Sequence, residues 1–190
     1  MLQCRTLTRA EIIDTYNVHM KNDFPEDELK PLTMILKSLD REQYICYGVF
    51  SDDVLCGYAY FAVIADNNKK YYLLDYFATV REMREKGIGS AFLNILYEHM
   101  TDVEMVICET ENPKGTIDDE FDIRNRRIGF YLRNKYIDTG VTASIFGVDY
   151  ILLELDLGNK HKKDEIRVYY SKLYRSFLPE KLYNKFVNIV

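Results

Sequence analysis

A short glycine-containing loop separates two apolar segments of different periodicity in the middle of the chain. The loop reads Arg84-Glu85-Lys86-Gly87-Ile88-Gly89-Ser90, after a strand-like run at 71–80 and before a segment whose apolar residues recur with helical period. Its two glycines let the backbone approach a ligand closely, and the first-turn N–H groups of the helix offer donors to an anion. The sequence therefore predicts a phosphate-binding turn between a strand and a helix.

Two familiar phosphate loops are excluded by the same residues. A dinucleotide-binding fingerprint needs a third glycine and an acidic residue about 20 positions later, and a Walker loop needs G-K followed by Ser or Thr. Neither pattern is present. A tight strand-to-helix turn without a ligand is the ordinary reason for a lone G-x-G, and this alternative stays open on the loop alone.

Composition and charge limit the class of protein. A chain of 190 residues is long enough for one domain with one substantial core, and a net charge of -5 argues against a general nucleic-acid binder. No apolar run approaches the ~20 residues that span a bilayer. The four cysteines have no metal-type spacing and nothing at the start resembles a signal peptide, so we expect a cytoplasmic protein with free thiols, no metal, no nucleic acid and no membrane.

The periodicity of apolar residues and the turn signals predict an alternation of strands and helices. Thr8 is expected to cap the first helix, with Glu11 completing a capping box. The expected elements are a strand at 2–6, helices at 8–20 and 25–39, strands at 44–51, 54–65 and 71–80, a helix from 87, a strand at 103–109, a polar loop at 110–120, a helix to 134, strands at 136–142 and 147–157, and two short helices within 162–190 divided at Pro179.

The loop and this order of elements together resemble the GNAT superfamily of N-acetyltransferases, with no subgroup indicated. The family motif [Q/R]-x-x-G-x-[G/A] lies between the fourth strand and the third helix, and Arg84-Glu85-Lys86-Gly87-Ile88-Gly89 matches it. The resemblance implies an α+β fold: a central, twisted, mostly antiparallel sheet of about seven strands flanked by helices. Residues 1–160 would form an acyl-CoA-dependent acyltransferase domain, and residues 161–190 a C-terminal helical extension packed either on that domain or on the partner subunit of a homodimer.

The resemblance also implies acetyl-CoA as co-substrate. In the family, the strand before the loop splays from its neighbour and pairs its backbone with the pantetheine arm, a role that falls by position to residues 77–79. The expected cofactor-binding residues are Phe77, Ala78, Thr79, Arg84, Glu85, Lys86, Gly87, Ile88, Gly89 and Ser90.

Three side chains are candidates for proton transfer. An amine with a pKa near ~10.4 is only about one part in 10³ neutral at pH 7, so a base is useful. Glu109 resembles by position the glutamate that several GNAT enzymes use as a base, directly or through water, and Asp75 on the strand before the loop is the alternative base. Either residue could instead be an exposed or hydrogen-bonded carboxylate without a catalytic role. Tyr131 stands where the family helix carries a tyrosine that protonates the leaving thiolate, although a packing role is the alternative for any one of 16 tyrosines.

The expected activity is transfer of an acetyl group from acetyl-CoA to a primary amine of a small molecule or peptide, by direct attack. The alternative is a non-catalytic module that binds or senses acyl-CoA. The acceptor is not encoded in these motifs, because the side chains that select it come from variable loops.

Overall fold

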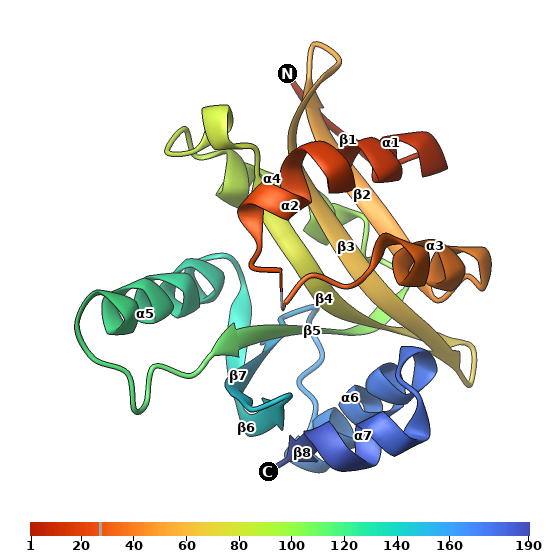
Figure 1. Cartoon of the computed structure of the whole chain (residues 1–190), viewed down its shortest axis with the longest axis vertical. Helices are drawn as coiled ribbons and strands as arrows, with labels where there is room; N and C mark the ends of the chain where they lie inside the picture. Colours follow the sequence, from red (N-terminus) through yellow and green to blue (C-terminus); the bar gives the residue numbers. More distant parts are fainter. Residues whose placement is uncertain (27) are drawn as a thin grey trace. The chain divides into compact units, whose positions relative to one another are not determined.

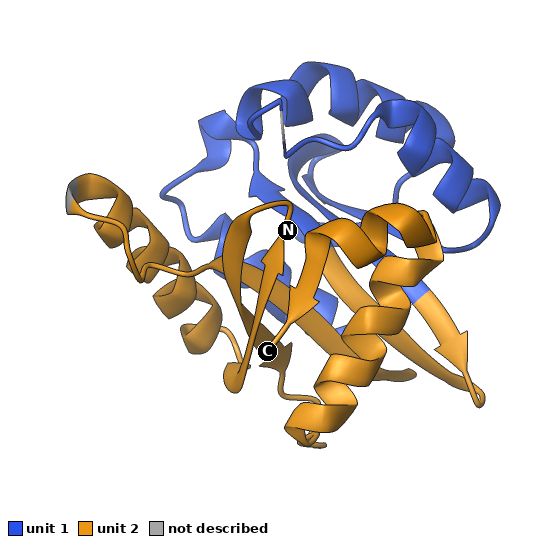
Figure 2. Cartoon of the chain, turned by 60° about the horizontal axis from the view of Figure 1, so that its bottom comes forward, with its two compact units in different colours: residues 1–63, 75–99 blue, residues 64–74, 100–190 orange. Residues whose placement is uncertain are grey.

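The computed structural model describes residues 1–26 and 28–190, which divide into two compact units (Figure 2). Unit 1 comprises residues 1–63 and 75–99, and unit 2 comprises residues 64–74 and 100–190. Two strands, β3 (Val54–Asp66) and β4 (Lys69–Thr79), run from one unit into the other.

Unit 1 contains both strands and helices of the first half of the chain (Figure 1). Besides parts of β3 and β4, its elements are β1 (Leu2–Thr6), α1 (Arg9–Thr15), a π-helical turn (Tyr16–Met20), α2 (Lys21–Asp23), α3 (Leu32–Asp40), β2 (Tyr44–Ser51), a 3-10 turn (Arg81–Met83) and α4 (Ile88–Glu98). The chain thus enters α4 directly from the glycine loop.

The start of the first helix agrees with the prediction, and the start of the second does not. The Thr8 hydroxyl accepts a hydrogen bond from the Glu11 amide, and the Glu11 carboxylate accepts one from the Thr8 amide at 2.8 Å, which confirms the capping box. Pro25 begins only a turn, and α3 starts after Pro31 at Leu32. The reason is that a proline disfavours helical backbone in the residue before it, so a helix running through Pro31 is interrupted there. Asp27, which the expected helix included, lies outside the described residues.

Both faces of the unit 1 strands are covered. Because side chains alternate along a strand, Tyr58 and Phe61 of β3 point to opposite faces. The Tyr58 hydroxyl donates to Asp23 at the end of α2, at 2.8 Å. On the other face, Phe61 contacts Tyr47, whose ring meets His99 at the end of α4. Figure 1 accordingly shows α1, α2 and α3 in front of these strands.

Unit 2 contains the second half of the chain and both C-terminal helices. Its elements, besides the first part of β4, are β5 (Val103–Glu111), α5 (Asp118–Arg133), β6 (Tyr136–Ile145), β7 (Val148–Leu155), α6 (Lys163–Phe177), α7 (Glu180–Phe186) and β8 (Val187–Ile189). The two tail helices are confirmed, with their division at Pro179. The strand after them was not predicted, because three residues are too few to display an alternating pattern.

The strands are ordered β1-β2-β3-β4-β5-β7-β6-β8. The pairing of β4 with β5 is parallel, whereas β1–β2, β2–β3, β5–β7, β6–β7 and β6–β8 are antiparallel. The fold is therefore α+β with a mostly antiparallel sheet, as the family resemblance implied, and the described part of the chain contributes eight strands to it instead of about seven. Among the described residues, no helix is long and apolar enough to cross a membrane.

Candidate active site

The glycine loop ends in a left-handed residue that starts α4. Gly87 is the N-cap, with φ of 75°, and the Ala91 amide makes the first helical hydrogen bond, to the Gly87 carbonyl at 3.1 Å. A Cβ at this position would meet no atom within 4 Å, so the need for glycine is one of backbone conformation and not of space. The amides of Ile88, Gly89 and Ser90 precede that first bond and form the donor end of the helix.

The side chain of Arg84 is held by unit 1 itself. Its Nη2 donates to Asp23 Oδ1 at 2.5 Å, and its Nε donates to the Thr79 carbonyl at 3.3 Å. The Asp23 side chain is only 5% exposed and also accepts from Tyr58. Sequence reasoning assigned Arg84 to a ligand, and the structure adds an intramolecular role: its guanidinium ties the start of the loop to α2 and to the end of β4.

Residues 77–79 of β4 are half-buried and lie beyond the segment that pairs with β5. The parallel pairing of β4 with β5 ends at Leu74 and Cys108, whereas β4 continues to Thr79 and β5 continues to Glu111. The Phe77 ring stacks on Phe92 of α4, with ring centroids 5.5 Å apart. The end of β4 is thereby fixed to the helix that follows the glycine loop.

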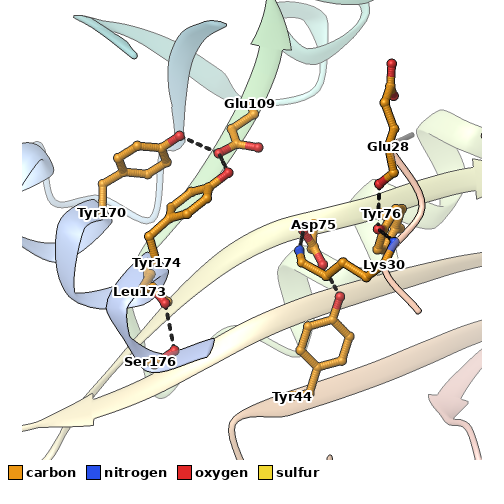
Figure 3. A network of polar contacts seen from close by, with 10 residues as sticks. All are labelled: Glu28, Lys30, Tyr44, Asp75, Tyr76, Glu109, Tyr170, Leu173, Tyr174 and Ser176. Carbon is orange, nitrogen blue, oxygen red and sulfur yellow. Dashed lines mark hydrogen bonds and ion pairs between the residues drawn. The ribbon is translucent and has the colours of Figure 1, made fainter. Parts of the chain in front are cut away.

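Asp75 is part of a buried polar network in unit 1 (Figure 3). One carboxylate oxygen accepts from Lys30 Nζ and the other from the Tyr44 hydroxyl. The Lys30 amide donates to the Tyr76 hydroxyl at 2.8 Å, and Tyr76 in turn donates to the Glu28 carbonyl at 2.9 Å. Both oxygens of Asp75 are thus engaged, and its side chain is 7% exposed.

Glu109 is held by two tyrosines that sequence reasoning did not assign to the site (Figure 3). The hydroxyls of Tyr170 and Tyr174, both on α6, donate to the same oxygen, Oε1, with Tyr174 at 2.6 Å. Burial and the neighbouring carboxylate raise the pKa of Tyr170 well above that of a free phenol, so this hydroxyl stays protonated and remains a donor. In the sequence these tyrosines indicate only the apolar face of an amphipathic helix.

Tyr131 contacts Cys108, the residue that precedes Glu109 in β5. It lies in α5, and its hydroxyl is hydrogen-bonded to the Cys108 thiol. Burial, followed by the nearby Cys108, raises the pKa of Tyr131 well above its ordinary value, and burial also raises the pKa of Cys108. Because Cys108 and Glu109 are successive residues of β5, they point to opposite faces. The structure thus places Glu109 with α6 and Tyr131 with α5, on opposite faces of one strand.

No group of three His, Cys, Asp or Glu residues within the described part of the chain is arranged to hold a metal ion.

Comparisons with known proteins identify the family. Residues 10–116 match the sequence profile of the acetyltransferase (GNAT) family. A search of curated proteins found no match. Three solved structures are similar in fold. A protein from Bacteroides thetaiotaomicron assigned to the GNAT acetyltransferase family has 20% identity over 90% of this chain and 96% of that chain, with a TM-score of 0.67. A ribosomal-protein-alanine N-acetyltransferase from Escherichia coli has 15% identity over 85% of this chain and 97% of that chain (TM-score 0.61), and a mutant spermidine N-acetyltransferase from Vibrio cholerae has 12% identity over 80% of this chain and 92% of that chain (TM-score 0.59). Since the profile match covers more than half of the chain, this protein belongs to the GNAT family and is an acetyltransferase.

Proposed function

We propose that the protein transfers an acetyl group from acetyl-CoA to a primary amine by direct attack, with Glu109 as the general base. The observation that carries this proposal is the Glu109 carboxylate, which lies near the end of β5, the strand after the glycine-loop helix, and accepts hydrogen bonds from two phenols. Hydrogen bonds to an ionised carboxylate favour its charged form, which is the form that accepts a proton.

The glycine loop is the proposed binding site for the pyrophosphate of acetyl-CoA. The left-handed Gly87, with open space around it, exposes the donor end of α4, which suits an anion. Each hydrogen bond from an amide to a charged phosphate oxygen contributes roughly 1.5–3 kcal/mol, so several amides outweigh the ~0.3–1 kcal/mol of the helix dipole. Arg84 holds the loop in place through Asp23, and the Lys86 ammonium is fixed beside it by the Glu82 carbonyl at 2.8 Å.

The rest of the cofactor is assigned to the strand before the loop. Phe77, Ala78 and Thr79 would bind the pantetheine arm through their backbone, a mode that depends little on side chains. A backbone amide near Ala78 or Thr79 would polarise the thioester carbonyl and stabilise the oxyanion that forms on attack.

Glu109 is preferred over Asp75 as the base. Asp75 already has a cationic partner, Lys30, and a hydroxyl partner, Tyr44, on its two oxygens. A proton taken up by Asp75 would disrupt a buried ion pair, which is costly when one partner loses its charge. The two phenols that donate to Glu109 carry no charge, so a proton taken up there breaks no ion pair with them.

Tyr131 is proposed to donate a hydrogen bond to the sulfur that leaves. Its hydroxyl is hydrogen-bonded to the neutral thiol of Cys108, so it already pairs with a sulfur atom. Because burial raises its pKa well above the ordinary value, complete proton transfer from Tyr131 is unfavourable. Its contribution would therefore come from the hydrogen bond, on the face of β5 opposite Glu109.

The acceptor class is a primary amine of a small molecule or a peptide. The solved structures named above include enzymes whose names specify a ribosomal-protein alanine and spermidine, and at 15% and 12% identity they are similar in fold alone. A screen with acetyl-CoA and representative amines, namely peptide N-termini, lysine, polyamines and aminoglycosides, would identify the acceptor.

The test measures release of the coenzyme A thiol in this screen, followed by two matched variants. Glu109→Gln should lower kcat by at least about 100-fold with the best acceptor, which is the low end of what general bases contribute. Glu98→Gln makes the same change at an exposed carboxylate in the last turn of α4, and should leave kcat within about twofold, as expected away from a site of chemistry. Tight acetyl-CoA binding without transfer to any acceptor would contradict the function, and a fully active Glu109→Gln enzyme would contradict the choice of base.

A further inference from the structure

We propose that α6, in the C-terminal extension, is part of the catalytic machinery, because Tyr170 and Tyr174 are positioning residues that keep the Glu109 base ionised and correctly oriented. This inference rests on the proposed function, since it concerns the same carboxylate. It assigns a role to residues that lie outside the segment 10–116 matched by the family profile.

The geometry places two donors on one acceptor. Tyr170 and Tyr174 are four residues apart on α6, so their side chains lie on the same face of the helix, with ring centroids 5.0 Å apart. Both hydroxyls point to Oε1 of Glu109 (Figure 3). Two donors that converge on one oxygen restrict the rotation of the carboxylate, as a reactive group requires.

The position of α6 is fixed independently of Glu109. Tyr169 stacks on Tyr71 of β4, with ring centroids 3.7 Å apart and an interplanar angle of 8°. Lys172 forms an ion pair with Asp66 at 2.5 Å. These contacts lie on either side of Tyr170, so the helix can hold its phenols in place when the charge on Glu109 changes during the reaction.

The beginning of α6 is anchored by a second polar group. His161, just before the helix, contacts Glu154 of β7 through Nδ1, and its Nε2 lies 3.4 Å from Glu104 of β5. Glu154 is buried, at 1% exposed. The extension is therefore attached to β5 at two points, near the start of the strand and at Glu109.

The two phenols have a consequence for proton transfer. A half-buried carboxylate without donors is driven towards its neutral form by the loss of solvation, and hydrogen bonds from groups that stay protonated oppose this. With both donors removed, Glu109 would be protonated at a higher pH. The acidic limb of the pH profile of kcat/KM should therefore move upward.

The experiment compares Tyr170→Phe, Tyr174→Phe and the double variant with Ser176→Ala, which removes from the same helix a hydroxyl that donates to the Leu173 carbonyl. Steady-state rates with acetyl-CoA and the best amine are measured between about pH 4 and pH 9, a range that includes both an ordinary glutamate pKa of ~4.3 and a raised one of ~6–7. The double variant should move the acidic limb upward by about one pH unit or more and lower kcat at least about tenfold, with the KM for acetyl-CoA unchanged. Ser176→Ala should follow the unmodified enzyme.

A second measurement separates a role through Glu109 from a loss of folding. In the Glu109→Gln background, the two phenylalanine substitutions should cause no further fall in kcat, because their effect passes through the missing carboxylate. If the unmodified enzyme is active and Glu109→Gln is impaired, but the double phenylalanine variant keeps the original profile, the inference is overturned and the proposed function stands. If the phenylalanine substitutions lower kcat equally with and without Glu109, the tyrosines act only in packing. If the unmodified enzyme transfers acetyl to no acceptor, the proposed function fails, and the role of the tyrosines fails with it.

Discussion

The ion pair between Arg84 and Asp23 makes a quantitative prediction about how the glycine loop is held. The Asp23 side chain is 5% exposed and that of Arg84 is 45% exposed, so the burial of this pair lies between that of an exposed and that of a fully buried ion pair. Exposed pairs contribute about 0.2–1 kcal/mol, whereas removing one partner of a fully buried pair costs about 3–5 kcal/mol. Arg84→Ala should therefore lower the free energy of unfolding by about 2 kcal/mol, with Tyr58 still donating to the carboxylate. For a chain of this length the melting temperature should fall by about 4–8 °C.

Urea unfolding of Arg84→Ala, Asp23→Ala and the double variant would measure the coupling directly. We expect a coupling energy of about 1–2 kcal/mol, because the two groups are in direct contact. A coupling energy below about 0.5 kcal/mol, the range of independent sites, would refute the stabilising role of the pair.

Calorimetric titration with coenzyme A carries the same reasoning to function. If Arg84 acts by fixing the loop, both Arg84→Ala and Asp23→Ala should weaken binding, each by about tenfold, since a loop must be ordered before its amides can converge on the pyrophosphate. An Asp23→Ala protein that binds coenzyme A normally, while Arg84→Ala binds it poorly, would show that the guanidinium contacts the ligand and does not act through the loop.

Three further predictions follow from other positions. Arg5, and next the Thr8 amide, hold the pKa of Glu11 at about 2, below its ordinary 4.5, so this contact stabilises the fold above pH 4.5 and is lost as the pH falls towards 2. The full pKa shift would correspond to about 3 kcal/mol, which solvent screening reduces to about 1 kcal/mol. Urea unfolding of Glu11→Gln should therefore show a loss of about 1 kcal/mol in unfolding free energy at pH 7 and none near pH 2. An equal loss at both pH values would contradict this prediction. Gly87→Ala should lower the free energy of unfolding by about 1–2 kcal/mol and weaken coenzyme A binding, because the φ of 75° at this position is left-handed. An unchanged melting temperature would contradict this backbone strain. Tyr131→Phe should lower kcat by about 10–100-fold with little change in KM, because a hydrogen bond to a developing thiolate contributes about that factor. A variant with the full rate would remove Tyr131 from the mechanism.

The sequence predicted most of the fold because its local signals agree with one another. Thr8 and Glu11 form the expected capping box, and strand β2 has the predicted bounds, Tyr44–Ser51. Asp52 and Asp53 have positive φ values, as their tight turn requires. These features depend on neighbours in the chain, so periodicity and turn chemistry are enough to recognise them.

The errors lie where long-range pairing or a proline decides the outcome. The second helix starts at Leu32 and not at Pro25, because Pro31 interrupts the segment. The short strand β8 exists because its backbone pairs with Ala143 and its neighbours in β6, far away in the sequence. Three residues carry no periodicity of their own from which such pairing could be predicted.

The candidate site divides in the same way. The sequence alone determined the glycine loop, its position between a strand and a helix, and therefore the family, because these depend on residue types at fixed spacing along the chain. The tertiary structure decided which side chains meet. It placed Asp23 against Arg84, and it placed Tyr170 and Tyr174 on Glu109, 61 and 65 residues away in sequence. A buried carboxylate must have its hydrogen bonds satisfied, and which distant residues do so is set by how helices pack on strands and not by any local pattern.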